Sequence, residues 1–435
     1  LSGPAHAARP TLQGSPVAGG PCQPGSPDTA PRALHIGLYT SPHLLDFRER
    51  IKIVTLPSVR ETGNFAHGDI TTMIPQEAVM DFVTTWQDYI DREGLSFFEI
   101  TTGMALWWFD RQGVDCAVIE TGLGGRLDST NIITPDLSII TSIGLDHCAI
   151  LGDSREQIAS EKAGIFKPGV PALVWGHDRQ TDPVFEAAAA ALGSPLHFAD
   201  SHSIIPGTAA PARPCRDGWS AGEYDRSGLA GANTPESNLR RDLIDGIQPR
   251  LDLRGDYQRA NLQTVLKALD ILGIPADGQV LDAICHTAEI TGLHGRWETL
   301  RTCPTVIADI GHNHAALRYN FAQLNEMMAS GSFDNLIIVY GVMADKDLDG
   351  IIPLMPRDAT YLFVTPGTPR AMPSSEILHR FLAAHDAPGA PRACDGGTVA
   401  QGIAGALDAA TPRSLIYIGG STFVVADAMA FLTHR

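Results

Sequence analysis

The stretch from Val114 to Lys167 decides the fold: VDCAVIETGLGGRLDSTNIITPDLSIITSIGLDHCAILGDSREQIASEKAGIFK. It contains two short apolar runs, Val114–Ile119 and Leu137–Ile143, which are rich in Val and Ile and lack strict alternation. Such runs are typical of strands that are buried on both faces of a parallel sheet. A third run of this kind, His35–Tyr39, lies earlier in the chain. The sequence therefore predicts an α/β fold with a parallel sheet.

Polar side chains follow each of these three runs. Glu120 follows one run, Asp146 and His147 follow another, and Ser41 and His43 follow the earliest. Ligands of open α/β sheets bind beyond the carboxyl ends of the strands, so we expect these side chains to converge at one sheet edge. Hydroxyl and carboxylate oxygens suit Mg²⁺. A single Glu or His after a strand is more often a solvated or structural residue, so the prediction depends on several of them meeting.

A glycine-rich loop and a short helix complete the stretch. The loop runs from Gly122 to Asn131, and the planar guanidinium of Arg126 within it suits a carboxylate or a phosphate. Ser154-Arg155-Glu156-Gln157 is a capping box that predicts a helix ending near Gly164. Lys162 falls in the last turn of that helix, where a cation is favoured for purely structural reasons.

Several longer motifs resemble the folylpolyglutamate synthase and dihydrofolate synthase family of the Mur ligase superfamily. They are GLYTSPHLLDFRERI (Gly37–Ile51), FFEITTGMALWWF (Phe97–Phe109), ETGLGGRLDSTN (Glu120–Asn131), TSIGLDH (Thr141–His147) and SEKAGIFKPG (Ser160–Gly169). Further pieces follow in family order, namely HGRWE, DIGHNHAA, TPGTPRA and GGST. The resemblance covers the chain from Leu34 to its C-terminus.

The resemblance implies an ATP-dependent ligase that adds L-glutamate to dihydropteroate, to folates or to both through an acyl phosphate. ATP and two Mg²⁺ ions are the implied cofactors. The implied metal ligands are Ser41, Glu120, His147 and Lys162, the last as a carbamoylated lysine, and Lys162, His147 and Glu120 are the implied catalytic residues.

The resemblance also implies residues that bind the substrates. Phe98, Arg126 and Asp128 are expected to bind the folate-type substrate, and Asn261, Arg296, Asp309 and His312 are expected to bind the nucleotide. Two structural alternatives stay open from the residues alone. Asn261 is equally well explained as a helix-initiating polar residue, and Asp309 as a helix N-cap.

The length suits two or three domains, and the resemblance implies two globular domains after an unusual N-terminal segment. The 435 residues are 44% hydrophobic and 19% charged, which is sufficient for a large core. We expect residues 34–287 to form a Mur-ligase-type ATPase domain that is truncated at its start. Residues 295–435, in which strands and helices alternate, are expected to form a Rossmann-like α/β domain. Residues 1–33 are expected to be disordered or non-native, because seven of the 30 prolines fall there without apolar periodicity.

The remaining composition indicates the cellular setting and the partners. The formal net charge of −17 argues against nucleic acid, and there is no apolar run long enough for a membrane span. The seven cysteines include no C-x-x-C pair, and the N-terminus lacks the pattern of a signal peptide, so a cytoplasmic monomer acting on small molecules is expected.

One expected motif is missing from the 435 residues. They contain no Gly-Lys-Ser or Gly-Lys-Thr, the lysine-bearing end of the P-loop that such a ligase uses to bind phosphates. The abrupt start of the resemblance at Leu34 leads to the hypothesis that residues 1–31 are out-of-frame or misjoined translation. The alternative to an active ligase is therefore an impaired or inactive family member that retains at most binding of folate or of a partner.

Overall fold

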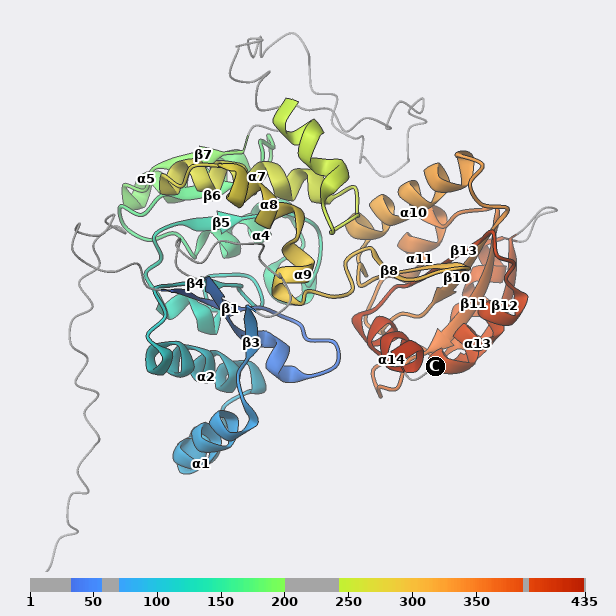
Figure 1. Cartoon of the computed structure of the whole chain (residues 1–435), viewed down its shortest axis with the longest axis horizontal. Coiled ribbons are helices and arrows are strands. Elements are labelled where there is room, and N and C mark those ends of the chain that lie inside the picture. The colour runs from blue at the N-terminus through green and yellow to red at the C-terminus, as the bar shows by residue number, and fades with distance from the viewer. Residues whose placement is uncertain (1–32, 57–69, 200–241, 386–390, 434–435) are drawn as a thin grey trace, which may run out of the picture.

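The computed structural model describes residues 33–56, 70–199, 242–385 and 391–433. Of the predicted N-terminal segment, Ala33 alone lies within these residues. Figure 1 shows two α/β parts side by side, which we call the N-terminal part (residues 33–286) and the C-terminal part (residues 295–433). Short helix α9 (Thr287–Thr291) lies at the junction that the sequence predicts.

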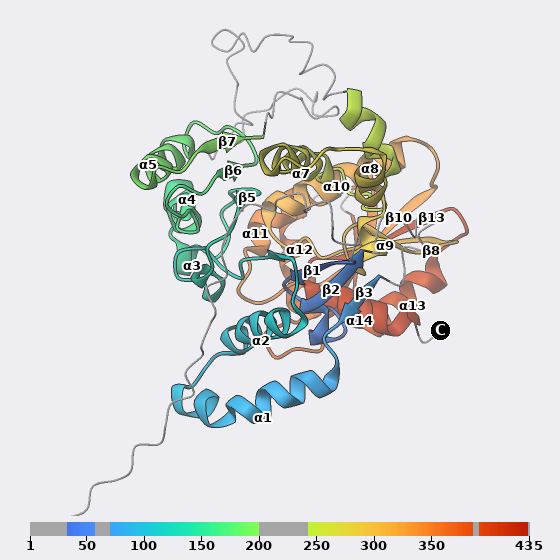
Figure 2. The ribbon, with the colours of Figure 1, turned by 60° about the vertical axis from the view of Figure 1, so that its left-hand side comes forward.

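The first sheet of the N-terminal part has the strand order β3-β2-β1-β4. Its strands are β1 (Leu34–Tyr39), β2 (Ile51–Leu56), β3 (Thr71–Met73) and β4 (Cys116–Ile119). β1 is parallel to β4 and antiparallel to β2. Helices α1 (Gln76–Glu93) and α2 (Phe97–Gln112) pack on one face of this sheet (Figure 2). There Phe82, Met104 and Phe109 join Tyr39 and Ile51 in a buried cluster.

The second sheet is parallel and consists of β5 (Ser138–Ile140), β6 (Ala172–Val174) and β7 (Leu196–Phe198). Successive side chains of a strand point to opposite faces. Accordingly, Ala172 and Val174 pack against α4 (Arg155–Ala163) and α5 (Asp182–Leu192), whereas Leu173 packs against α7 (Gln258–Leu272). The N-terminal part also contains the shorter helices α3 (Cys148–Leu151) and α8 (Gly278–Cys285).

The prediction that the strands formed by His35–Tyr39, Val114–Ile119 and Leu137–Ile143 end at one sheet edge is wrong for the third of them. β1 and β4 are neighbours, but β5 belongs to the second sheet, and among the described residues no strand pairs with the outer edge of β4 or of β5. Val118 of β4 is 60% exposed and Ile139 of β5 is 38% exposed, so these strands are not buried on both faces as predicted. Apolar runs identify strands, but they do not specify which strands pair.

The C-terminal part is a six-stranded sheet with the order β12-β11-β10-β13-β9-β8. Its strands are β8 (Glu298–Thr302), β9 (Thr305–Asp309), β10 (Asn335–Tyr340), β11 (Ala359–Thr365), β12 (Arg392–Thr398) and β13 (Ser414–Gly419). All neighbours are parallel except β8 and β9. This confirms the predicted second α/β fold.

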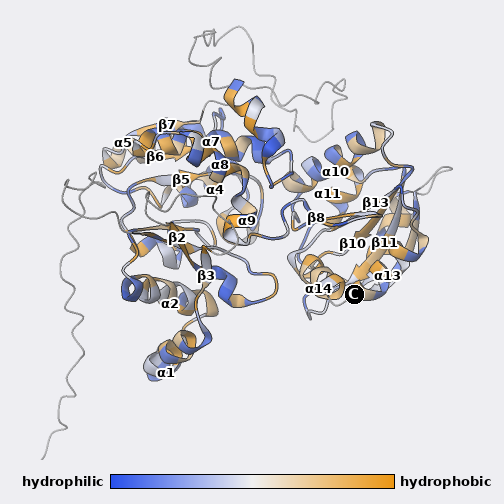
Figure 3. Ribbon diagram, in the orientation of Figure 1, coloured by the Kyte–Doolittle hydropathy of each residue, from blue (hydrophilic) through white to orange (hydrophobic). Residues whose placement is uncertain are grey.

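Helices cover both faces of this sheet. Helices α10 (His314–Ala329), α11 (Leu348–Ile351) and α12 (Ser374–Ala384) pack on one face, and α13 (Val399–Ala409) and α14 (Thr422–Thr433) pack on the other. The central strands are strongly hydrophobic in Figure 3, as expected for strands buried between two helical layers.

Asp309 does not cap a helix, and Asn261 does not initiate one, so both structural alternatives from the sequence are wrong. The N-cap of α10 is Asn313, whose side-chain oxygen accepts a 2.9 Å hydrogen bond from the amide of Ala316, whereas Asp309 remains in β9. Helix α7 begins at Gln258, so Asn261 lies in its first turn and does not initiate it. The capping box at Ser154 and the end of α4 before Gly164 are confirmed.

Direct hydrogen bonds join the two parts. The hydroxyl of Tyr257 donates to Oδ2 of Asp309 at 2.8 Å, and the amide of Asp256 donates to the side-chain oxygen of Gln323 at 3.0 Å. At the junction, the ammonium of Lys52 on β2 donates to the carbonyl oxygen of Thr291 at 2.7 Å. Thr40 and Pro42, which follow β1, line one small cavity with Arg296 and Ile310, so this edge of the N-terminal part faces the C-terminal part.

Candidate functional site

The carboxyl ends of β1 and β4 bring two predicted site residues together. Because the strands are parallel neighbours, the residues that follow them lie side by side. The backbone amide of Ser41 donates a 2.7 Å hydrogen bond to Oε2 of Glu120. Enclosure by protein raises the pKa of Glu120, and the Ser41 amide, Arg296 and Arg50 oppose this rise. The structure thus places two of the four predicted metal ligands beside each other.

A basic and aromatic group at this edge was missed in the sequence. Arg50 donates from Nε to Nδ1 of His43 at 2.9 Å, and its guanidinium lies 5.4 Å from the ring centroid of Phe97. Burial, followed by the charge of Arg50, lowers the pKa of His43 and favours a neutral imidazole. Arg50 precedes β2, which pairs antiparallel with β1, and this pairing could not be read from the sequence.

The predicted substrate residue Asp128 organises the glycine-rich loop. Its Oδ2 accepts hydrogen bonds from the amides of Gly122 at 3.0 Å and Leu123 at 2.8 Å, and its Oδ1 accepts one from the amide of Thr130 at 2.9 Å. Both carboxylate oxygens are therefore engaged within the loop, and a role in binding substrate remains a prediction.

The loop also rests on the C-terminal end of α4. A Cβ atom at Gly125 would lie 2.7 Å from the carbonyl oxygen of Glu161 and 2.8 Å from that of Lys162, so this close approach requires glycine. The amide of Arg126 donates to the Glu161 carbonyl at 2.8 Å, and Nη2 of Arg126 lies 2.9 Å from Oε1 of Glu161. The guanidinium predicted to bind substrate is thus paired with Glu161.

Phe98, another predicted substrate residue, lies beneath the start of this loop. A side chain at Gly122 would collide with the ring of Phe98, and that ring is 6.0 Å from the ring of Tyr39. Phe98 therefore connects the loop to the core beneath β1.

Lys162 is held in the last turn of α4, close to the loop. Burial lowers the pKa of Lys162, and the charges of Asp146 and Asp128 oppose this shift. Within the described part of the chain, no carboxylate lies within ion-pair distance of its ammonium. Lys162 consequently loses its proton more readily than an exposed lysine does.

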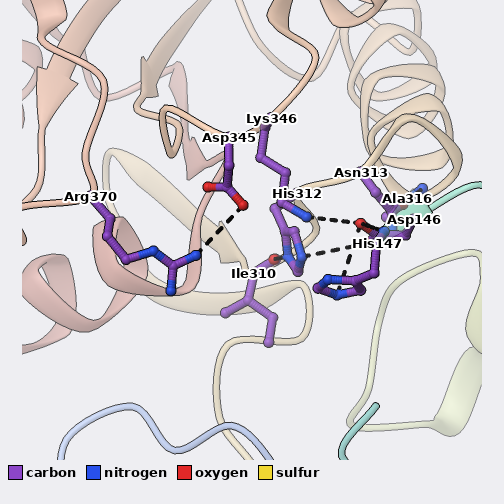
Figure 4. Close-up of polar contacts among 9 residues, drawn as sticks. All are labelled: Asp146, His147, Ile310, His312, Asn313, Ala316, Asp345, Lys346 and Arg370. Carbon is purple, nitrogen blue, oxygen red and sulfur yellow. Dashed lines mark hydrogen bonds and ion pairs between the residues drawn. The ribbon is translucent and has the colours of Figure 1, made fainter. Parts of the chain in front are cut away.

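Asp146 forms the centre of a cluster that joins both parts (Figure 4). Its Oδ1 accepts a hydrogen bond from Nζ of Lys346 at 2.9 Å, and its Oδ2 accepts one from Nδ2 of Asn313 at 3.1 Å. His147 and His312 each have Nε2 3.9 Å from one of these oxygens. Burial alone would raise the pKa of Asp146, but the hydrogen bonds from Lys346 and Asn313 bring it down to about 2.

Asp309, predicted to bind the nucleotide, is 2% exposed and fully engaged inside the protein. Its Oδ1 accepts hydrogen bonds from the amide of Gly311 at 2.7 Å and from Asn320 at 2.7 Å. Its Oδ2 accepts hydrogen bonds from the amide of Trp297 at 2.8 Å and from the hydroxyl of Tyr257 at 2.8 Å. These contacts give Asp309 a structural role, and its role in nucleotide binding stays a prediction.

The other residues predicted to bind the nucleotide are spread around the junction. Arg296 lines a small cavity together with Glu49 and Lys52. Asn261 is exposed on α7 and donates to the side chain of Gln258 at 2.8 Å. Tyr257, which precedes α7, contacts Asp309, but among the described residues no hydrogen bond joins Asn261 to the C-terminal part. The structure thus groups Ser41 with Glu120, and His147 with His312, without joining Asn261 to either group.

Comparisons with known proteins agree with this architecture. Residues 295–422 match the model of the "Mur ligase, glutamate ligase domain" family. A dihydrofolate synthase/folylpolyglutamate synthase of Haemophilus influenzae is 29% identical over 413 residues, which cover 91% of this chain and 82% of that protein. The structure of E. coli FolC in complex with DHPP and ADP is 25% identical with a TM-score of 0.66, covering 92% of this chain and 83% of that one.

Over most of its length the chain is therefore similar to folylpolyglutamate synthase/dihydrofolate synthase enzymes, and its residues 295–422 match a Mur ligase domain.

The similar proteins differ in length. A probable bifunctional folylpolyglutamate synthase/dihydropteroate synthase of Haloferax volcanii is 29% identical over 405 residues, which cover 92% of this chain and 43% of that protein. The chain thus spans less than half the length of this relative. A structure of a bifunctional folylpolyglutamate synthase/dihydrofolate synthase with Mn, AMPPNP and L-glutamate bound is 26% identical with a TM-score of 0.64, covering 92% of this chain and 83% of that one.

The side chains at the ends of β1 and β4 include a possible ligand of a divalent ion. The carboxylate of Glu120, which accepts a hydrogen bond from the backbone amide of Ser41, is an oxygen ligand of the kind that suits a hard cation. Among the described residues, no three His, Cys, Asp or Glu side chains are grouped closely enough to hold a metal ion. The predicted set of Ser41, Glu120, His147 and Lys162 as ligands of shared ions therefore remains a prediction. The described helices include none that is long and apolar enough to cross a membrane.

Proposed function

We propose that this chain is an ATP-dependent ligase that adds L-glutamate to dihydropteroate, to folates or to both. The observation that carries the proposal is the Ser41–Glu120 contact at the ends of β1 and β4, within the electrostatic reach of Arg50 and Arg296. A carboxylate that would hold a divalent ion, with two arginines near enough to influence its charge, suits a reaction between a carboxylate and a polyphosphate.

The proposed reaction has two steps. The carboxylate of the pterin substrate takes the γ-phosphate of ATP, which releases ADP and forms an acyl phosphate. The amine of glutamate then attacks the acyl carbon, phosphate leaves, and the amine loses a proton as the amide forms. Relatives with bound ADP and DHPP, and with bound AMPPNP, Mn and L-glutamate, support this choice of substrates.

The residues around Glu120 would hold the reactants together. Mg²⁺, when bound, would screen the negative charges of the two anionic substrates. Glu120, with its carboxylate fixed by the amide of Ser41, would hold the ion, and His147, which follows β5, would be a further ligand. Arg50, beside Phe97, and Arg296, at the junction, would bind anionic groups of the substrates.

Lys162 is proposed to act as a carbamate. Its neutral amine would add to CO₂, forming an N–C bond and losing a proton, and the cation would become an anion with two acceptor oxygens. Two features favour this step, namely the lack of an ion-pair partner among the described residues and the burial that lowers the pKa of the amine. The carbamate would then help to hold the divalent ion.

A second candidate function is binding of folate without turnover. One observation favours this second function: the 435 residues contain no Gly-Lys-Ser or Gly-Lys-Thr. A helix and loop that cradle phosphates depend on that motif for backbone amides and for a lysine.

Assays of the purified chain distinguish the two functions. The chain is incubated with ATP, Mg²⁺, labelled L-glutamate and either dihydropteroate or a reduced folate, and the glutamylated product is detected by mass spectrometry. A ligase gives a product that requires both ATP and the pterin substrate. Glu120→Gln, which retains the shape but removes the charge, should abolish the product.

Binding measurements complete the test. If calorimetry detects folate binding while no product forms and no ATP is consumed, the second candidate is correct for these residues. If neither product nor folate binding is found, both functions are wrong for these residues.

A further inference from the structure

The loop that carries His147 is tied to the C-terminal part through the residue before it. Asp146 binds Lys346, which follows β10, and Asn313, which follows β9. These two partners come from different loops of the C-terminal sheet, and each bonds a different oxygen of the carboxylate. The single carboxylate of Asp146 therefore fixes two C-terminal loops and one N-terminal loop relative to one another.

Both partners are themselves held in place. The side-chain oxygen of Asn313 caps α10 while its amide nitrogen donates to Asp146, so both ends of this side chain are engaged. The amide of Lys346 donates to the carbonyl of Met343 at 3.1 Å. The side chains of Lys346 and Asp146 are 15% and 23% exposed, so water competes less for this ion pair than for a surface pair.

Asp146 also sets the backbone of His147. Oδ1 of Asp146 accepts a 2.8 Å hydrogen bond from the amide of His147, whose φ is +55°. A non-glycine residue in this left-handed region persists when its surroundings fix it. The direction of the imidazole thus depends on a carboxylate that the C-terminal part holds.

We propose that Asp146 is a positioning residue, which places His147 in the site only when Lys346 and Asn313 of the C-terminal part are docked. This inference deepens the proposed function and rests on it for the role of His147. The tie between the parts, however, can be measured without any ligase activity. The position of the His147 imidazole would then depend on whether the C-terminal part is docked on the N-terminal part.

The first experiment measures the tie itself. Hydrogen exchange of the amides at residues 144–151 is followed by mass spectrometry in the wild type, Asp146→Ala, Lys346→Met and the double variant. We expect both single variants to accelerate exchange in this segment, and the double variant to be no faster than the faster single variant, because the two residues form one interaction. Lys346→Arg, which retains the cation, should restore slow exchange.

The second experiment measures the positioning of His147. We expect Lys346→Met to raise the Mg²⁺ concentration for half-maximal turnover about tenfold, as for other residues that orient metal ligands. Arg413→Met is the matched control, because it removes the 2.8 Å ion pair with Asp334 within the C-terminal part alone. The control should leave both the Mg²⁺ dependence and the exchange of residues 144–151 unchanged.

Each outcome decides one part of the inference. Unchanged exchange in Lys346→Met overturns the tie between the parts, whether or not the chain is an active ligase. Faster exchange with an unchanged Mg²⁺ dependence overturns the positioning of His147. If the wild type shows no ligation at all, the proposed function is wrong and the positioning of a metal ligand falls with it, while the exchange data still decide the tie.

Discussion

At the scale of single residues, the structure shows an environment of Lys162 that its sequence motif does not reveal. The sequence predicts its place in the last turn of a helix, and α4 confirms that place. Its burial and its lack of an ion-pair partner within the described residues could not be predicted, because they depend on the glycine-rich loop that docks on α4.

We predict that Lys162→Met abolishes turnover but does not destabilise the protein. Methionine keeps the length of the side chain and removes a charge that burial disfavours, so the free energy of unfolding should stay the same or rise slightly at pH 7. Urea unfolding and the glutamate-ligation assay measure the two effects. Lys267→Met on α7 serves as the control for removing a lysine, and near-normal turnover in Lys162→Met would refute the catalytic role.

A second residue-scale prediction concerns pH and the pair of His294 and Glu298, whose Nδ1 and Oε1 atoms are 2.9 Å apart. The hydrogen bond to Glu298 raises the pKa of His294, and Glu49 and Lys52 nearby act in opposite directions. The hydrogen bond from His294 and the Gly295 amide outweigh burial and lower the pKa of Glu298. The pair is therefore fully charged between the ordinary pKa values of the two groups, 4.5 and 6.5.

The sign of the effect follows from these two directions. The contribution of His294 is complete below pH 6.5 and is lost as the pH rises through its raised folded-state pKa. We expect His294→Gln to cost about 0.2–1 kcal/mol at pH 5.5 and less at pH 8.5. Urea unfolding at both pH values checks this, with the exposed His379→Gln on α12 as the control. An equal cost at both pH values would show that the pair does not titrate as described.

At the scale of elements, local motifs were predicted better than strand pairing. The capping box at Ser154, the glycine that ends α4 and the alternating units of the C-terminal part are all confirmed, because each depends on a few adjacent residues. The division of β1, β4 and β5 between two sheets could not be predicted, since it depends on contacts between distant segments. For the same reason the sequence did not reveal Arg50 beside the predicted site.

The element-scale prediction concerns the start of α4. In its capping box, the hydroxyl of Ser154 accepts from the amide of Gln157 at 3.2 Å, and the side chain of Gln157 accepts from the amide of Ser154 at 3.3 Å. Ser154→Ala removes one of these bonds and should cost about 0.5–2 kcal/mol of stability. Ser154→Thr retains the hydroxyl and should cost much less. Equal losses in the two variants by urea unfolding would mean that the cap is not the cause.

At the scale of the whole molecule, the two parts are joined by separate polar contacts. Tyr257 donates a hydrogen bond to Asp309, and Lys346 donates one to Asp146. Lys52 donates a hydrogen bond to the carbonyl oxygen of Thr291, in the helix between the two parts. The sequence predicted a junction and residues on both sides of it, but it did not predict these partners. Polar contacts of this kind are compatible with a change in the spacing of the two parts when substrates bind.

We therefore predict that the spacing of the parts responds to substrate and to Tyr257. Tyr257→Phe removes the hydroxyl that donates to Asp309, so the ligand-free variant should have a larger radius of gyration than the wild type. ATP together with a folate should reduce the radius in both proteins. Small-angle X-ray scattering measures this, and identical radii with and without the two ligands would rule out closure driven by substrates.

The divided sheet of the N-terminal part has a consequence for the behaviour of the chain in solution. The outer edges of β4 and β5 carry backbone amides and carbonyls that pair with no other strand among the described residues, and Val118 and Ile139 are exposed beside them. Unpaired edges with apolar neighbours are templates for β-strand addition and aggregation. The monomeric state expected from the sequence therefore depends on what covers these two edges, and the same edges would accept an extended peptide as an additional strand.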